Sequence, residues 1–128
     1  MMQYSVVDRR PEESILELLK QHNISVLARG ALAQGLLVDK PAKEYLGYSK
    51  EEIAQANKAI HSLSGPNRNA AQTAIQFSLN HPAVGSAVIG IRNRKQLKEA
   101  AAGGKRLLKK EVAILQEVLR PRQYEQHR

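Results

Sequence analysis

The sequence predicts an α/β fold in which about three parallel strands alternate with helices, within a single domain spanning residues 1–128. Two observations favour parallel strands. A strand, a helix and a second strand follow one another between residues 4 and 28, and another helix precedes a third strand near residue 88. No internal repeat or linker interrupts the chain, which is long enough to bury one core. The pattern is typical of part of an α/β sheet or barrel.

The first three predicted elements form a strand-helix-strand unit. Residues 4–7 have β propensity, and Pro11 is expected at the first position of a helix with an acidic first turn. Helical spacing predicts an apolar stripe made of Ile15, Leu18, Leu19 and His22. Asn23 is expected to end this helix, and the apolar residues 24–28, flanked by turn residues, then form the second strand.

A long connection follows the second strand. Residues 30–37 are rich in glycine and alanine, and residues 38–48 continue as a polar segment. Ser49 and Glu52 have the spacing of a capping box, which predicts the start of a helix that ends at residues 64–66. The buried face of this helix is predicted to contain Ile53, Ala56, Ile60 and Leu63.

Two more helices and a strand are predicted before the chain reaches its end. Residues 69–80 form an alanine-rich helix, and the third strand follows at residues 86–89. A final helix over residues 109–119 is expected to bury Val112, Leu115 and Leu119. Residues 120–128 are expected to form a loose polar tail.

The turn after the third strand is basic and leads into a helix that ends at residues 103–104. Asn93 is expected to cap this helix, with Gln96 reaching back to its start. Arg92, Arg94 and Lys95 crowd the same turn, where positive charge opposes the helix dipole unless an anion is bound. The turn therefore predicts a phosphate site, and the alternative is a solvated turn with a basic rim.

Composition excludes several classes of protein. The 128 residues carry a net charge of +8 and no cysteine, which excludes disulfides, thiolate metal sites and thiol nucleophiles and favours the cytoplasm. No apolar run is long enough to span a membrane, and no signal peptide is recognisable. Residues 92–128 contain 11 basic and 4 acidic side chains, so nearly all of the excess charge lies there.

Four segments together resemble the C-terminal part of the aldo/keto reductase family. They are residues 4–10, 24–37, 69–80 and 88–99, and the Ala-Arg-Gly-Ala-Leu-Ala-Gln-Gly-Leu-Leu and Ile-Gly-Ile-Arg-Asn motifs carry most of the likeness. The resemblance implies part of a (β/α)8 TIM barrel, with family strands six to eight and their helices. It also implies carbonyl reduction by hydride transfer from NADPH in the full-length enzymes.

The resemblance assigns the loop after the second strand to the cofactor. Arg29 stands beside the nicotinamide, where many members have an aromatic residue, and Gly30 is its small neighbour. The following loop would track the pyrophosphate, which favours small residues because the backbone must approach closely. Its matched positions include Ala31, Leu32, Gln34 and Gly35.

The basic turn matches the family's site for the adenosine end of NADP(H). Gly90, Ile91 and Arg92 correspond to the turn that receives the 2′-phosphate, with Arg92 as its ionic partner. Gln96 flanks that phosphate, and Glu99 matches the acid that contacts the adenine amino group. Ala100 departs from the family, which commonly has asparagine there.

No residue of this chain matches the catalytic tyrosine, lysine, aspartate and histidine of the family, which come from the first half of the barrel. The four tyrosines and four histidines lack the partners or spacing of an acid, a base or a metal site. The chain alone is therefore expected to be inactive.

Three strands cannot close a barrel, so the chain is expected to bind a missing N-terminal half or a second copy. It fits a piece of a longer enzyme, a truncated gene product or a split subunit.

Two functions without redox chemistry remain as alternatives. A basic interaction module would bind nucleic acid or an acidic partner through cations near the C-terminus. Those cations are Lys95, Lys98, Lys105, Arg106, Lys109 and Lys110. The absence of interleaved aromatic residues makes nucleic acid an unfavourable partner. The other alternative is a scaffold that self-associates through its open strand edges.

Overall fold

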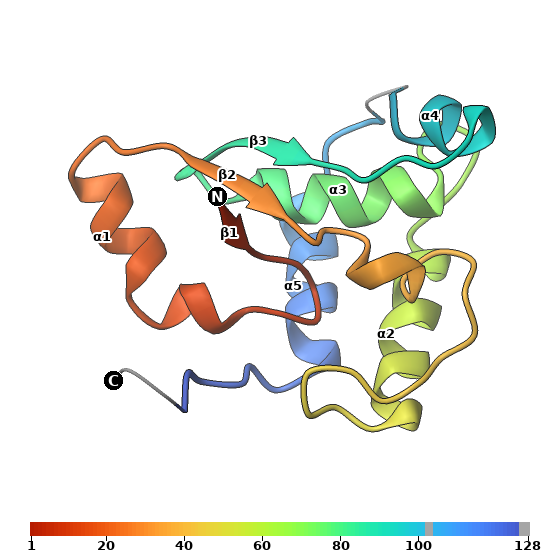
Figure 1. Ribbon diagram of the computed structural model, residues 1–128, viewed down its shortest axis with the longest axis horizontal. Coiled ribbons are helices and arrows are strands. Elements are labelled where there is room, and N and C mark those ends of the chain that lie inside the picture. The colour runs from red at the N-terminus through yellow and green to blue at the C-terminus, as the bar shows by residue number, and fades with distance from the viewer. Residues whose placement is uncertain (102–103, 126–128) are drawn as a thin grey trace.

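A three-stranded parallel sheet in the order β1-β2-β3 organises the fold (Figure 1). The computed structural model describes residues 1–101 and 104–125. The strands are β1 (Met2–Gln3), β2 (Val26–Arg29) and β3 (Val84–Val88). The α-helices are α1 (Ile15–Gln21), α2 (Lys50–Ser62), α3 (Ala70–Asn80), α4 (Arg94–Ala101) and α5 (Lys109–Val118). Short 3₁₀ helices are η1 (Arg10–Glu13) and η2 (Ala33–Gly35).

One face of the sheet is packed and the other is open. Val26 and Ala28 of β2 are buried, whereas Leu27 and Arg29 between and after them are exposed, as strand alternation requires. α3 and α5 lie behind the sheet in Figure 1 and cover the packed face. The ladder aligns Arg29 with Gln3 of β1 and with Val88 of β3, so these side chains share the open face.

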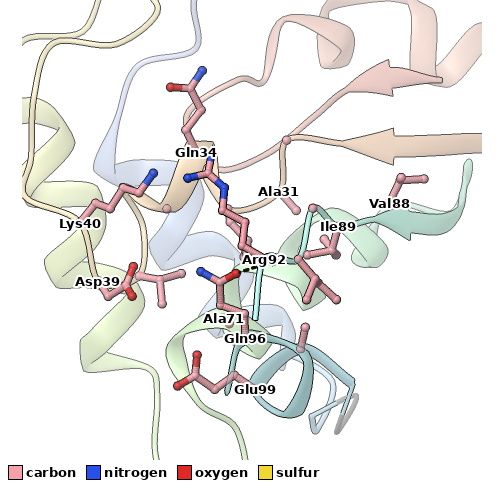
Figure 2. Close-up of a pocket in the computed structure, with 17 residues that line it drawn as sticks. Ala31, Gln34, Asp39, Lys40, Ala71, Val88, Ile89, Arg92, Gln96 and Glu99 are labelled. Carbon is pink, nitrogen blue, oxygen red and sulfur yellow. Dashed lines mark hydrogen bonds between the residues drawn. The ribbon is translucent and has the colours of Figure 1, made fainter. Parts of the chain in front are cut away.

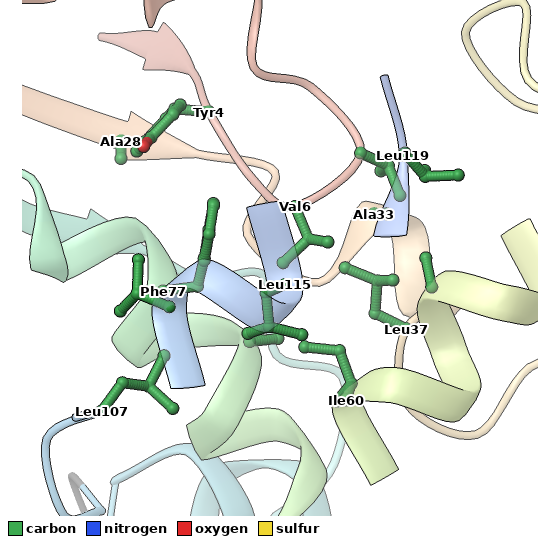
Figure 3. Close-up of a cluster of buried hydrophobic side chains, with 14 of the residues drawn as sticks. Tyr4, Val6, Ala28, Ala33, Leu37, Ile60, Phe77, Leu107, Leu115 and Leu119 are labelled. Atoms are coloured by element: carbon green, nitrogen blue, oxygen red, sulfur yellow. The ribbon is translucent and has the colours of Figure 1, made fainter. Parts of the chain in front are cut away.

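The core lies between the packed face of the sheet and the three longest helices. In Figure 3, Ile60 of α2 and Leu115 of α5 lie close together in the core, while Phe77 of α3 points toward Tyr4 and the sheet. Phe77 is also 5.9 Å from the ring of Tyr4, measured between ring centroids. Val112, Leu115 and Leu119 are buried as the sequence predicts. Aliphatic side chains therefore supply most of the packing in a chain with few aromatic residues.

Local capping signals start the two longest helices. Ser49 Oγ accepts a hydrogen bond from Glu52 N, and Glu52 Oε2 accepts one from Ser49 N, which confirms the predicted capping box. Asn69 and Gln72 form a second capping box at the start of α3. Each box satisfies backbone donors that the first turn of a helix leaves unpaired.

The first strand differs from the sequence prediction. Residues 4–7 were expected to form it, but β1 is Met2–Gln3, and Tyr4 N only extends the ladder by donating to Arg29 O. Ser5 and Asp8 then exchange two backbone hydrogen bonds across a tight turn. The apolar residues at positions 6 and 7 are buried by packing against the core after this reversal, so their β propensity predicted a strand that tertiary contacts override.

The first helix also differs from its prediction. Pro11 lies in η1, and Ser14, with φ of −160°, separates this 3₁₀ turn from α1. Leu16, which was absent from the predicted stripe, is fully buried, whereas Leu18 is 49% exposed and His22 is exposed. The helix begins only after Ser14 and buries Leu16, and of the predicted stripe Leu19 is partly buried against the core.

Residues 120–125 contact the loop around Tyr48 and the start of η1. Tyr48 Oη donates to Arg120 O at 2.7 Å, and the Arg122 guanidinium lies 4.9 Å from the Tyr48 ring centroid. Arg10 lies at the same distance over the ring of Tyr124. Residues 126–128 of the predicted tail, and Gly103 at the predicted end of α4, lie outside the described residues. None of the described helices is long and apolar enough to cross a bilayer.

Candidate functional site

A cleft of about 670 Å³ opens between the loop of residues 30–40 and the turn that joins β3 to α4 (Figure 2). Pockets for small molecules and cofactors have volumes of about 300–1,000 Å³. The cleft brings together every predicted site residue except Arg29. These are Gly30, Ala31, Leu32, Gln34, Gly35, Gly90, Ile91, Arg92, Gln96, Glu99 and Ala100. Arg29 projects instead from the end of β2 onto the open face of the sheet.

The loop that forms one wall folds back on itself because it adopts several left-handed conformations. Gly30 and Gly35 have φ of +75° and +93°, and Gln34 between them also has a positive φ. Glycine adopts this region without steric cost. Behind the loop, Asn57 Nδ2 of α2 donates to Leu36 O at 2.8 Å. His61 Nε2 lies 2.7 Å from Val38 O. The wall is therefore held by the second helix.

Lys40 is a cleft residue that the sequence analysis missed. Its side chain lies over Gly35, where an added Cβ would be 3.1 Å from Lys40 Cδ. Figure 2 shows the side chains of Lys40 and Arg92 both pointing into the cleft. The signal was the first of two lysines that follow the glycine-rich loop. The other missed lining residues are Val38, Asp39, Ala71, Val88 and Ile89.

The opposite wall is the capped start of α4. Asn93 Oδ1 accepts from Gln96 N at 2.9 Å, which confirms Asn93 as the predicted cap. Gln96 Oε1 reaches back to Arg92 N at 2.8 Å. The two backbone donors of this turn are thus satisfied by side chains. This hydrogen bond uses the amide oxygen of Gln96, so its amide nitrogen is the group that could donate to a ligand.

The cleft presents both positive and negative side chains to a ligand. Among the described residues, no ion pair uses Arg92 or Lys40, whereas Lys95 Nζ lies 3.7 Å from Glu99 Oε1. Two unpaired cations therefore face the same space from opposite walls. Two carboxylates, Asp39 and Glu99, also line it, so a ligand that carries both phosphate and hydrogen-bond donors fits the charge pattern.

The tyrosines are placed to support the structure and not to transfer protons in the cleft. None of the four lines it. Burial is the main cause that raises the pKa of Tyr4, Tyr45, Tyr48 and Tyr124, so each keeps its proton near neutral pH. The described residues also contain no cluster of histidine, aspartate and glutamate that could hold a metal ion. The geometry supports binding and gives no acid-base pair.

Comparison with known proteins extends this picture. The family model described as aldo/keto reductase matches residues 1–120. An uncharacterized oxidoreductase, YqkF of Bacillus subtilis (strain 168), is 40% identical over the whole chain, which covers 45% of that protein. Pyridoxal 4-dehydrogenase of Microbacterium luteolum is 28% identical over 75% of the chain, or 29% of its own length. The chain thus spans under half the length of these relatives.

Solved structures agree with this result. The holo form of aldo-keto reductase AKR11C1 from Bacillus halodurans superposes with a TM-score of 0.84 and 32% identity, covering 98% of this chain and 44% of that one. Glycerol dehydrogenase AKR11B4 of Gluconobacter oxydans, at 20% identity and a TM-score of 0.71, shares the fold. Three parallel strands with surrounding helices, predicted as part of a (β/α)8 barrel, are confirmed. The chain belongs to the aldo/keto reductase family.

Proposed function

We propose that this chain binds NADP(H) in the cleft and is the dinucleotide-binding part of an aldo/keto reductase. The observation that carries the proposal is the pair of unpaired cations, Arg92 and Lys40, that face one cleft from opposite walls. A dinucleotide with an extra phosphate supplies anions at two separated points. The solved relative from Bacillus halodurans is described as a holo form, which supports a cofactor site in this family.

Each wall of the cleft would hold a different part of the cofactor. The Arg92 fork suits the 2′-phosphate because it can donate to two oxygens, and Gln96 offers its amide nitrogen beside it. Lys40 and the loop around Gly35 suit the pyrophosphate. Glu99 is placed for the adenine amino group. The reduced nicotinamide supplies hydride, and its ring would lie toward Arg29 at the open face of the sheet.

Hydride transfer by this chain would require a second polypeptide segment. In the part of the chain that the structure describes, no tyrosine lines the cleft, and the sheet has two free edges and an open face. Leu27 and Val88 on that face are 49% and 43% exposed. A protein segment that pairs with these edges and covers the open face would bury Leu27 and Val88. It could also supply a proton donor. We propose an N-terminal barrel half as this partner, and a second copy of the chain is the alternative occupant.

Titration of the chain with NADPH and NADH tests the proposal. We expect tighter binding of NADPH, and Arg92→Ala should weaken NADPH binding at least tenfold while leaving NADH nearly unchanged. Arg94→Ala is the matched control, because Arg94 lies two residues away at the start of α4 but does not line the cleft. Equal loss for both nucleotides, or an Arg94 variant as weak as the Arg92 variant, would contradict this assignment.

A further inference from the structure

One side chain, Asn69, joins the ends of two helices. Its Oδ1 accepts a hydrogen bond from Gln72 N at 2.8 Å and caps the start of α3. Its Nδ2 donates to Glu99 O at 3.1 Å, near the end of α4. Both contacts satisfy backbone groups that helix ends leave unpaired. The carbonyl end of α4 thus lies beside the amide end of α3, an arrangement in which the two helix dipoles attract.

The position of α4 depends on such contacts because the helix has little else to hold it. None of the eight residues of α4 is buried, and Leu97 is 49% exposed. Nevertheless, Gln96, Glu99 and Ala100 of this helix form one wall of the cleft. A helix without buried side chains moves easily unless polar contacts fix it. The hydrogen bond from Asn69 to α4 therefore helps to set the distance between the two walls of the cleft.

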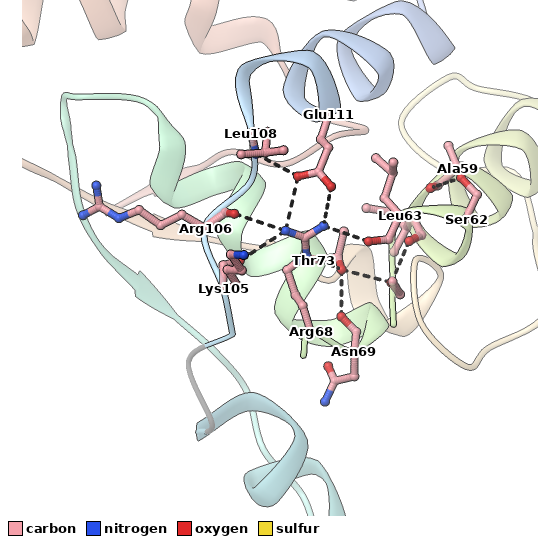
Figure 4. A network of polar contacts seen from close by, with 12 residues as sticks. Ala59, Ser62, Leu63, Arg68, Asn69, Thr73, Lys105, Arg106, Leu108 and Glu111 are labelled. Carbon is pink, nitrogen blue, oxygen red and sulfur yellow. Dashed lines mark hydrogen bonds and ion pairs between the residues drawn. The ribbon is translucent and has the colours of Figure 1, made fainter. Parts of the chain in front are cut away.

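The chain that leaves α4 is also fixed by the residue beside Asn69. Arg68 Nη1 donates to the carbonyl oxygens of Lys105 and Arg106 (Figure 4). Gly104 packs so tightly that an added Cβ would lie 2.7 Å from Gln72 Cβ. Segments before and after the undescribed residues 102–103 are thus both anchored at the start of α3.

We propose that Asn69 is a positioning residue that holds α4 as the adenosine-side wall of the cleft. This inference rests on the proposed NADP(H) site. Asn69 does not line the cleft, so its effect passes through the Glu99 carbonyl to the residues of α4 that do. Loss of the Nδ2 donor leaves that carbonyl to water and frees the last turn of α4. The affinity for the adenosine end of the cofactor then falls although the ligand touches none of the changed atoms.

Two variants separate the tether from the helix cap. Asn69→Asp keeps the capping oxygen but replaces the donor with an acceptor that the Glu99 carbonyl repels. Asn69→Ser also keeps a capping oxygen but adds no charge near an anionic ligand. Because both retain the cap, we expect melting temperatures close to that of the wild type. Ser49→Ala is the matched control, since it removes the equivalent cap of α2, far from α4.

Hydrogen exchange of the free chain gives the first readout. Amides of residues 94–101 should exchange about threefold to tenfold faster in both Asn69 variants, and amides of α2 should not change. Binding of adenosine 2′,5′-bisphosphate gives the second. Its affinity should fall about threefold to tenfold in both variants, as expected for one lost hydrogen bond, and stay unchanged in Ser49→Ala.

The outcomes distinguish the two proposals. Unchanged exchange in α4, or equal affinity of Asn69→Ser and wild type for the bisphosphate, overturns the positioning role. A lower melting temperature without faster amide exchange specifically in α4 also overturns it, because Asn69 would then act only as a cap. Failure of the wild type to bind either the bisphosphate or NADPH overturns the NADP(H) site itself, whether or not α4 exchange responds.

Discussion

Arg68 and Glu111 form a two-point ion pair that joins the start of α3 to the start of α5. Arg68 Nη2 lies 3.1 Å from Glu111 Oε1, and Arg68 Nη1 lies 3.3 Å from Glu111 Oε2. The same guanidinium donates to Leu63 O at 2.7 Å, at the end of α2 (Figure 4). One nearly buried side chain therefore connects three helices. Removing it leaves a carboxylate and several carbonyl groups without their donor.

Arg68→Met should lower the free energy of unfolding by about 3 kcal/mol, because it keeps the apolar stem and removes the charge that pairs with Glu111. Chemical denaturation monitored by circular dichroism measures the change. Arg106→Met is the control, since Arg106 is exposed and contributes its backbone carbonyl to the same network. A loss below about 0.5 kcal/mol in the Arg68 variant, within the range of ordinary surface substitutions, would contradict a stabilising role.

Glu111 should make stability depend on pH in the acid range. The hydrogen bond from Arg68 is the main cause that lowers the pKa of Glu111 below its ordinary value of 4.5. A lowered native pKa contributes stability that is present above 4.5 and is lost as the pH falls through the native value. Glu111→Gln removes this contribution. It should be less stable than wild type by about 2 kcal/mol at pH 7, and the difference should shrink in acid. A constant difference across that range would contradict the pairing.

Sequence patterns predicted the elements whose signals are local. Ser49 and Glu52 are three residues apart, so the sequence alone indicates their capping box. α2 begins where that box predicts. The buried face of α5 followed from helical spacing for the same reason. The second and third strands were found with boundaries shifted by up to two residues, because β propensity does not fix where the ladder begins.

The features that prediction missed depend either on local backbone conformations that the sequence pattern does not reveal or on contacts between distant residues. Leu16 is buried and Leu18 exposed because the backbone breaks at Ser14, which helical counting does not detect. The bond from Asn69 to Glu99 spans 30 residues. Lys40 reaches the cleft only because the preceding loop turns back through left-handed conformations. The family resemblance identified most cleft residues, whereas the tether and the second cation required the folded chain.

Lys40→Met should weaken binding of NADPH and NADH to the same extent. Its amine is placed for a phosphate that both cofactors carry, in contrast to Arg92, which is assigned to the phosphate found only in NADPH. We expect about a tenfold loss for each nucleotide by calorimetric titration, with little change in stability because no ion pair is broken. Lys43→Met is the control, since Lys43 lies outside the cleft. A loss confined to NADPH would instead place Lys40 at the 2′-phosphate.

The open face of the sheet should govern association and contribute little to the stability of the chain alone. Leu27 and Val88 lie on this face and are about half exposed, so Leu27→Glu removes few contacts and should change the free energy of unfolding by less than about 1 kcal/mol. The added carboxylate would nevertheless have to be desolvated when another chain covers the face. Sedimentation velocity should therefore show weaker assembly of the Leu27→Glu variant, either with an N-terminal barrel half or with itself.

Leu18→Glu is the control, because Leu18 is equally exposed but lies on α1, away from the sheet. Equal assembly by the Leu27→Glu variant and wild type would mean that the partner does not cover this face.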